Sequence, residues 1–153
     1  MIEPIIASLT LADKPAVFSM LQDPEVMRFL GPQRALTDAE AEVWFNEHLL
    51  TPSRLVFKDK HTHALIGFCG VKQIAGQDDF GYFLLRQFWG QGLALKIIQM
   101  ALIEIAKSQT LEQCQVFIDK DNGASLALAN KLGWQRAGEQ TEATSGKWRY
   151  FLA

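Results

Sequence analysis

The fold of this chain is decided by the stretch Asp79-Phe-Gly-Tyr-Phe-Leu-Leu-Arg-Gln-Phe-Trp-Gly-Gln-Gly-Leu-Ala94. It combines an apolar strand, a short loop with two glycines, and the abrupt start of a long apolar helix. Such a helix leaves its first N–H groups without intrahelical partners, at the positive end of its dipole. Gly90 and Gly92 carry no side chain that would block an approaching anion. The stretch therefore predicts a site for phosphate or pyrophosphate, with a ligand-free tight turn as the alternative.

This loop resembles the cofactor loop of the GNAT family of acetyl-CoA-dependent N-acetyltransferases. The family loop reads Gln/Arg-x-x-Gly-x-Gly/Ala, and Trp89-Gly-Gln-Gly-Leu-Ala94 has the form typical of the RimJ/RimL-like branch. A second segment, Asn122-Gly-Ala-Ser-Leu-Ala-Leu-Ala-Asn-Lys-Leu-Gly-Trp134, is similar to that branch's Asn-x-x-Ser…Lys-x-Gly-Phe, with Trp in place of Phe. The order of elements also agrees with the family, from about residue 4 to about residue 152.

Two other phosphate-binding loops fit the residues less well. A Rossmann fingerprint needs a third glycine where Leu95 stands, and Glu112 lies at the start of its strand rather than at the end, where a ribose would bind. A nucleoside-triphosphate loop needs a Gly-Lys-Ser/Thr sequence, which does not follow Gly92. The resemblance to the GNAT cofactor loop therefore remains, and it implies an acyl-CoA ligand.

Composition indicates an ordinary globular protein. The chain has 153 residues, of which 48% are hydrophobic and 21% charged, with a net charge of −2. This predicts a single domain over residues 1–153, with a substantial core and no nucleic-acid footprint. The start of the sequence has no basic segment followed by an apolar one, and no apolar run reaches membrane-spanning length, so we expect a cytoplasmic protein without membrane contact. Cys69 and Cys114 lie in apolar runs and are expected to be buried free thiols.

Periodicity predicts the elements. The first helix is expected to follow a cap at Thr10 or Asp13 and to run to about residue 22. Further helices are expected over 25–30, 38–50, 93–107 and 124–132, and strands over 5–9, 55–60, 64–74, 80–85, 113–119, 134–138 and 148–152. Thr37 and Glu40 form a capping box before the helix 38–50. The order indicates an α/β (α+β) fold. The resemblance implies a GNAT-like mixed, mostly antiparallel central sheet of about six to seven strands, flanked by about four helices. One parallel strand pair, 80–85 with 113–119, would lie at the cofactor site.

The resemblance also implies which residues bind acetyl-CoA. The backbone of Tyr82, Phe83 and Leu84 would bind the pantetheine amides like an added strand. The pyrophosphate loop would comprise Trp89, Gly90, Gln91, Gly92, Leu93, Ala94 and Leu95, with the Trp89 ring packed against the loop rather than on the cofactor. Asn122 would contact CoA through its side chain, and a simple N-cap of the next helix is the alternative.

Catalytic residues follow from the same resemblance. RimJ/RimL-like enzymes are thought to use a serine at the position of Ser125 to protonate the CoA thiolate, and a first-turn residue without further role is the alternative. The tyrosine acid of many GNATs is replaced here by Ala129, and a glutamate common in the branch by Lys96. An alkylamine must lose a proton before it attacks. Asp79 is the candidate base, Asp119 is a second, and a solvated carboxylate is the alternative for each.

Together these patterns predict an acyl-CoA-dependent N-acetyltransferase. Acetyl-CoA would be the co-substrate, and a protein N-terminus or a small-molecule amine would attack it directly. A non-catalytic acyl-CoA-binding or sensing module with the same fold is the alternative. We expect no metal, because His48 has no cluster of ligands at suitable spacing. The protein is expected to be a monomer or a homodimer.

Overall fold

The computed structural model describes residues 1–74, 77–111, 114–136 and 147–152. These residues form one seven-stranded sheet in the order β1-β2-β3-β4-β5-β7-β6. Its strands are β1 (Pro4–Ala7), β2 (Leu55–Asp59), β3 (Leu65–Ile74), β4 (Gln77–Leu84), β5 (Gln115–Asp119), β6 (Gln135–Arg136) and β7 (Lys147–Phe151). Neighbouring strands are antiparallel except β4 and β5, which are parallel. The predicted mixed sheet with one parallel pair is confirmed.

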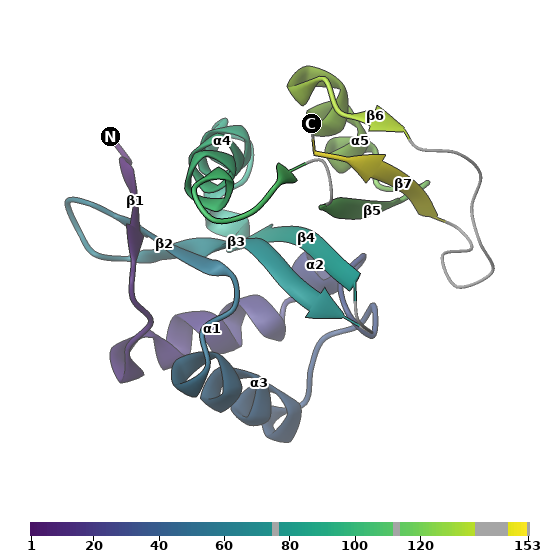
Figure 1. Cartoon of the computed structure of the whole chain (residues 1–153). Coiled ribbons are helices and arrows are strands. Elements are labelled where there is room, and N and C mark those ends of the chain that lie inside the picture. Colours follow the sequence, from purple (N-terminus) through teal and green to yellow (C-terminus); the bar gives the residue numbers. More distant parts are fainter. Residues whose placement is uncertain (75–76, 112–113, 137–146, 153) are drawn as a thin grey trace.

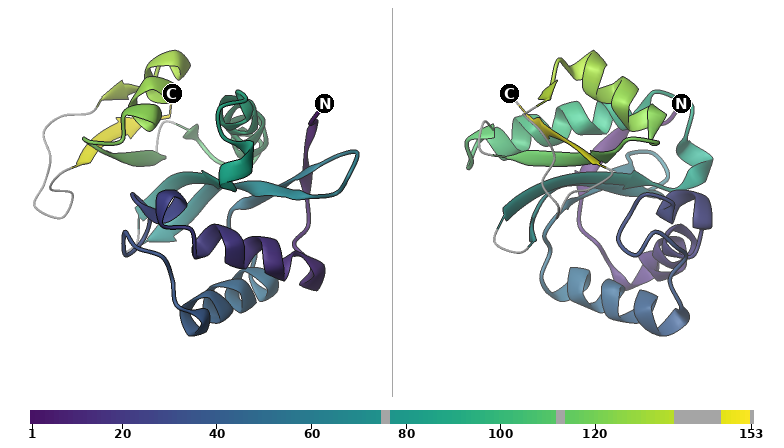
Figure 2. Two further views of the ribbon diagram at one scale, coloured as in Figure 1. Left: turned by 180° about the vertical axis from the view of Figure 1, so that it is seen from behind. Right: turned by 90° about the vertical axis from the view of Figure 1, so that its right-hand side faces the viewer.

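Helices cover both faces of this sheet (Figures 1 and 2). They are α1 (Lys14–Leu21), α2 (Pro24–Met27), α3 (Asp38–Leu50), α4 (Leu93–Ala106) and α5 (Gly123–Leu132). The first three lie on one face, while α4 and α5 lie on the other. The predicted capping box opens α3, because the Glu40 N–H donates to Thr37 Oγ1 over 3.2 Å and the Thr37 N–H donates to Glu40 Oε1 over 2.9 Å. Among the described residues, no helix combines the length and apolarity needed to cross a membrane.

The core lies between the sheet and these helices. Phe45, Phe57, Phe68 and Phe80 are among the largest buried side chains. Helix α4 buries the same face at every turn, through Leu93, Ile97, Ile98, Ala101 and Ile105. This spacing keeps one stripe of the helix against the sheet. Cys69 and Cys114 are buried free thiols, as predicted.

Most differences from the predicted elements are shifts of one to three residues at their ends. The first strand stops at Ala7, because the Thr10 N–H donates to Asp13 Oδ2 over 2.8 Å and starts a helical turn there. Strand β5 starts at Gln115, and β4 begins at Gln77, earlier than predicted. The strand expected at 134–138 is limited to Gln135–Arg136 within the described residues, and 137–138 lie outside them.

The sheet opens between its two parallel strands. Asp79 pairs with Gln115, and no later pair joins β4 to β5 among the described residues. Beyond this point β5, β7 and β6 form a separate wing beside α5 (Figure 1). Side chains of β4 alternate between the two faces. Phe83 therefore packs on Trp44 of α3, whereas Tyr82 reaches Ser125 of α5. The opening leaves polar backbone of β4 available to a ligand.

Candidate functional site

The N-terminus of α4 lacks a side-chain cap. Its N-cap is Gly92, and the first turn carries no acidic residue. By contrast, Thr37 caps α3 and Asn122 caps α5 through side-chain oxygens. The first helical bond of α4 runs from the Lys96 N–H to the Gly92 carbonyl, over 3.3 Å. The amides of residues 93–95 therefore have no intrahelical acceptor, which suits an anion.

The glycine loop takes the conformation that its glycines permit. Gly90 and Gly92 have φ angles of +74° and +75°, in the left-handed region where other residues are strained. Among the described residues, no heavy atom outside the glycine and its chain neighbours lies within 4 Å of a Cβ built on either residue. These two glycines therefore allow the left-handed backbone conformation of the loop and leave open space at the N-terminus of α4.

A cavity of about 580 Å³ joins this helix end to the gap between β4 and β5. This size is in the range of small-molecule and cofactor sites. Most of the predicted site residues line it, namely Tyr82, Phe83, Leu84, Trp89, Gly90, Gly92, Leu93, Ala94, Leu95, Asn122 and Ser125. Two predicted residues do not line it. The side chain of Gln91 donates to the Gln87 carbonyl over 3.0 Å, and Asp79 lies at the closed end of the strand pair.

Trp89 fastens the loop to the end of β4. Its indole Nε1 donates to the carbonyl of Leu84 over 3.1 Å. The side chain remains 45% exposed, so it does not belong to the core. The indole therefore holds the loop in place. The bond also occupies the last carbonyl of β4.

Asn122 has the geometry of an N-cap. Its Oδ1 accepts the Ser125 N–H over 3.2 Å. The cap uses only the amide oxygen, and no described residue accepts a hydrogen bond from the Asn122 NH₂ group. Because Asn122 also lines the cavity, capping and ligand contact are compatible in one side chain.

The side chain of Tyr82 joins the site directly. Its hydroxyl lies 2.5 Å from Ser125 Oγ, and either oxygen can donate. Burial raises the pKa of Tyr82, while the hydrogen bond with Ser125 opposes that shift. The sequence predicts only a backbone role for Tyr82. The alternation of side chains along β4 places the Tyr82 ring on the face of α4 and α5. Its contact with Ser125, which lies 43 positions later in the chain, has no local signal in the sequence.

The two candidate bases have different surroundings. Asp79 is largely buried and forms an ion pair with Arg54, with 3.1 Å between Oδ2 and Nη2. Burial raises the pKa of Asp79, and Arg54 opposes the shift. Arg54 was not predicted, since it lies 25 residues before its partner. Asp119 ends β5 on the cavity wall, and its Oδ1 accepts the Asp121 N–H over 2.9 Å.

His48 belongs to the packing between α3 and the sheet. Its ring stacks on Trp44 with centroids 3.6 Å apart, and its Nδ1 lies 2.9 Å from the Trp44 carbonyl. Burial lowers the pKa of His48. No group of three or more His, Cys, Asp or Glu side chains within residues 1–74, 77–111, 114–136 and 147–152 has the arrangement of a metal site.

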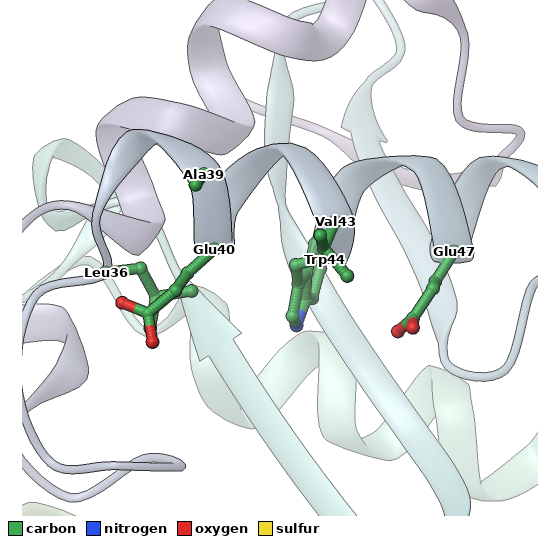
Figure 3. Close-up of a pocket in the computed structure, with 6 residues that line it drawn as sticks. All are labelled: Leu36, Ala39, Glu40, Val43, Trp44 and Glu47. Atoms are coloured by element: carbon green, nitrogen blue, oxygen red, sulfur yellow. The ribbon is translucent and has the colours of Figure 1, made fainter.

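A second hollow, of about 380 Å³, lies along one side of α3 (Figure 3). It is lined by Leu36, Ala39, Glu40, Val43, Trp44 and Glu47. Glu40 is already engaged, since Arg34 donates to both its oxygens over 2.7 Å. This hollow contains no hydroxyl or thiol and does not reach the glycine loop. The cavity at α4 is therefore the candidate site.

This chain is similar to known acetyltransferases in sequence. A family described as "Acetyltransferase (GNAT) domain" matches residues 5–135. The uncharacterized N-acetyltransferase p20 of Bacillus licheniformis is 26% identical over 141 residues, which cover 87% of this chain and 79% of that protein.

Solved structures share the fold at low sequence identity. An acetyltransferase of the GNAT family from Bacillus anthracis has a TM-score of 0.79 at 17% identity, covering 98% of this chain and 95% of that one. A spermidine N-acetyltransferase SpeG chimera, from Vibrio cholerae and hSSAT, has a TM-score of 0.73 at 17% identity, covering 97% and 94%.

Proposed function

The chain belongs to the GNAT acetyltransferase family, and we propose that it transfers an acetyl group from acetyl-CoA to a primary amine. One observation carries the proposal. A single cavity connects the uncapped N-terminus of α4 to the hydroxyl pair of Tyr82 and Ser125. An anion-binding end and an acid–base end in one cavity are what an acyl-CoA substrate requires.

Binding would use mainly backbone groups. The amides of residues 93–95 would hold the pyrophosphate, with Gly90, Gln91 and Gly92 shaping the loop. The pantetheine arm would lie along residues 82–84 of β4, in the place that a further strand would take. Asn122 would donate its free NH₂ group to the cofactor. This direction places the thioester near Ser125.

The proposed reaction is direct attack of the amine on the thioester. A covalent acyl-enzyme would need an activated thiolate. Burial raises the pKa of both Cys69 and Cys114, which holds them as thiols. Ser125 would protonate the departing sulfur. Asp79 is the proposed base, acting through water, and Asp119 is the second candidate because it lines the cavity.

The setting of the activity is part of the same proposal. We propose a single acetyltransferase domain over residues 1–153, of the RimJ/RimL-like branch, that acts in the cytoplasm without a metal, as a monomer or homodimer. The acceptor would be a protein N-terminus or a small-molecule amine. The likeness to a spermidine N-acetyltransferase makes polyamines reasonable members of a test panel.

A panel of amines tests the function. Release of the CoA thiol is followed with acetyl-CoA and each of several polyamines, amino acids and peptides with free N-termini, and acetylated product is identified by mass spectrometry. We expect at least one amine to be acetylated, with one thiol released per acetyl group. Binding of acetyl-CoA with no amine acetylated would instead favour the sensing module, which has the same cavity.

A further inference from the structure

Tyr82 and Ser125 form a hydroxyl pair across the opening of the sheet. Tyr82 comes from β4 and Ser125 from the first turn of α5, and their oxygens are 2.5 Å apart. Both side chains line the cavity. The backbone of Ser125 is held in place, since its N–H donates to Oδ1 of Asn122, the N-cap of α5. The position of Ser125 in this contact is therefore fixed by the start of α5.

A serine hydroxyl alone is a poor donor to a departing thiolate. It is a far weaker acid than a thiol of pKa about 8.5, so complete transfer of its proton would leave an unfavourable alkoxide. A phenol of ordinary pKa about 10 is much closer to the thiol in acidity. When a phenol gives its proton to the serine oxygen while the serine gives its own proton to the sulfur, the negative charge ends on the phenol oxygen. Tyr82 is placed to do this.

Resting on the proposed function, we propose that Tyr82 and Ser125 form a proton relay to the sulfur of CoA, in which Ser125 is the donor and Tyr82 is its positioning residue. The helix position of the usual tyrosine acid holds Ala129, whose side chain is fully buried and cannot donate. The phenol at the site comes instead from β4.

The relay conserves atoms and charge. As the tetrahedral intermediate collapses, the carbon–sulfur bond breaks and sulfur keeps the electron pair. Sulfur takes the proton of Ser125 Oγ, and Ser125 takes the proton of Tyr82. The Tyr82 phenolate then regains a proton from water. The proton lost by the amine passes through water to the proposed base and then to solvent, so the products are the amide and CoA thiol.

The surroundings of Tyr82 keep it protonated before the reaction. Burial raises its pKa, and the neighbour paired with it on β3 is Cys69, itself a buried thiol. The charged side chains of Lys131 on α5 and Asp119 on β5 line other parts of the same cavity. The Tyr82 hydroxyl therefore holds its proton at neutral pH before the reaction.

The first test compares Tyr82→Phe, Ser125→Ala and the double variant. Each single variant should lower kcat by about 10- to 1000-fold, with little change in the KM for acetyl-CoA. The double variant should be no slower than the slower single variant, because both changes interrupt one relay. Tyr150→Phe and Ser108→Ala are matched controls outside the cavity. Additive losses in the double variant, or a Tyr82→Phe enzyme with normal kcat, would overturn the relay.

A second measurement does not depend on turnover. The thiol of CoA bound to the protein is titrated by its thiolate absorbance in the ultraviolet. Hydrogen bonds from the pair stabilise the thiolate, so the pKa of bound CoA should lie below that of free CoA. Tyr82→Phe and Ser125→Ala should each raise it toward the free value, and Tyr150→Phe should leave it unchanged. Equal titrations in all four proteins would overturn the relay even if one variant folded poorly.

The two measurements separate the relay from the proposed function. Bound CoA whose thiol titration depends on Tyr82 and Ser125, with no amine acetylated, refutes the enzyme but retains the hydroxyl pair as a sulfur-binding site. Turnover with a normal kcat in both Tyr82→Phe and Ser125→Ala refutes the relay but not the proposed function. A protein that does not bind CoA overturns both.

Discussion

Gly92→Glu tests the anion site at the start of α4, with Gly92→Gln as the matched neutral control. Both side chains meet open space, since no described residue other than the chain neighbours lies within 4 Å of a Cβ on Gly92. Both also place a residue with a side chain at φ +75°, which costs about 1–2 kcal/mol of folding free energy. The two variants therefore differ only in charge.

The added charge has opposite effects on the free protein and on binding. In the free protein, a carboxylate at the helix N-terminus stabilises α4 by about 0.3–1 kcal/mol relative to glutamine. Against a bound phosphate about 5 Å away, the same charge costs roughly 1–3 kcal/mol at effective dielectric constants of about 80 to 20. Acetyl-CoA should therefore bind Gly92→Glu roughly 5- to 150-fold more weakly than Gly92→Gln.

Calorimetric titration with acetyl-CoA, together with thermal melts, measures both effects. We expect the glutamate variant to melt at or above the temperature of the glutamine variant, yet to bind more weakly. The gap in affinity should narrow in high salt, which screens exposed charges. Equal affinities of the two variants at low salt would refute the placement of the pyrophosphate at α4.

Three further substitutions test other parts of the structure. Asn122→Ala should lower the free energy of unfolding by about 1 kcal/mol, because the N-cap is lost, and this is measured by chemical denaturation. It should also weaken acetyl-CoA binding by roughly 1–2 kcal/mol, because a hydrogen bond to the cofactor is lost. An unchanged affinity in calorimetry would mean that Asn122 acts only as a cap. Arg54→Met should lower the free energy of unfolding by roughly 2–4 kcal/mol, because Asp79 keeps a largely buried charge. That loss should shrink in urea melts at lower pH, since protonation of Asp79 removes the charge; a loss independent of pH would contradict the ion pair. His48 has a lowered pKa, so protons bind the unfolded chain preferentially and stability falls as pH drops below about 6.5. His48→Phe should reduce the fall in Tm between about pH 7.5 and about pH 5.5, whereas an undiminished fall would assign the acid sensitivity to other groups.

Local signals in the sequence were sufficient for much of the fold. The capping box of Thr37 and Glu40 depends on residues three apart, and it starts α3 where predicted. The path of the loop at Gly90 and Gly92 depends on two residues that tolerate positive φ. The period of two along residues 80–84 placed alternate side chains on opposite faces. Each of these features is set within a few residues.

Features that depend on strand register were not accessible in this way. The ion pair of Arg54 with Asp79 joins the segment before β2 to β4, across the intervening β3. The contact of Tyr82 with Ser125 requires both the opening between β4 and β5 and the position of α5. Neither distance follows from spacing along the chain, because the register of β2, β3 and β4 sets the first and the packing of α5 beside the sheet sets the second.

Titration of the wild-type protein with acetyl-CoA by calorimetry tests the central claim most directly. The proposed site predicts saturable binding of one acetyl-CoA per chain, with affinity that falls as salt rises, because the pyrophosphate meets backbone amides and a helix dipole. Absence of binding at millimolar acetyl-CoA would contradict the assignment of the cavity between β4 and β5 to an acyl-CoA substrate.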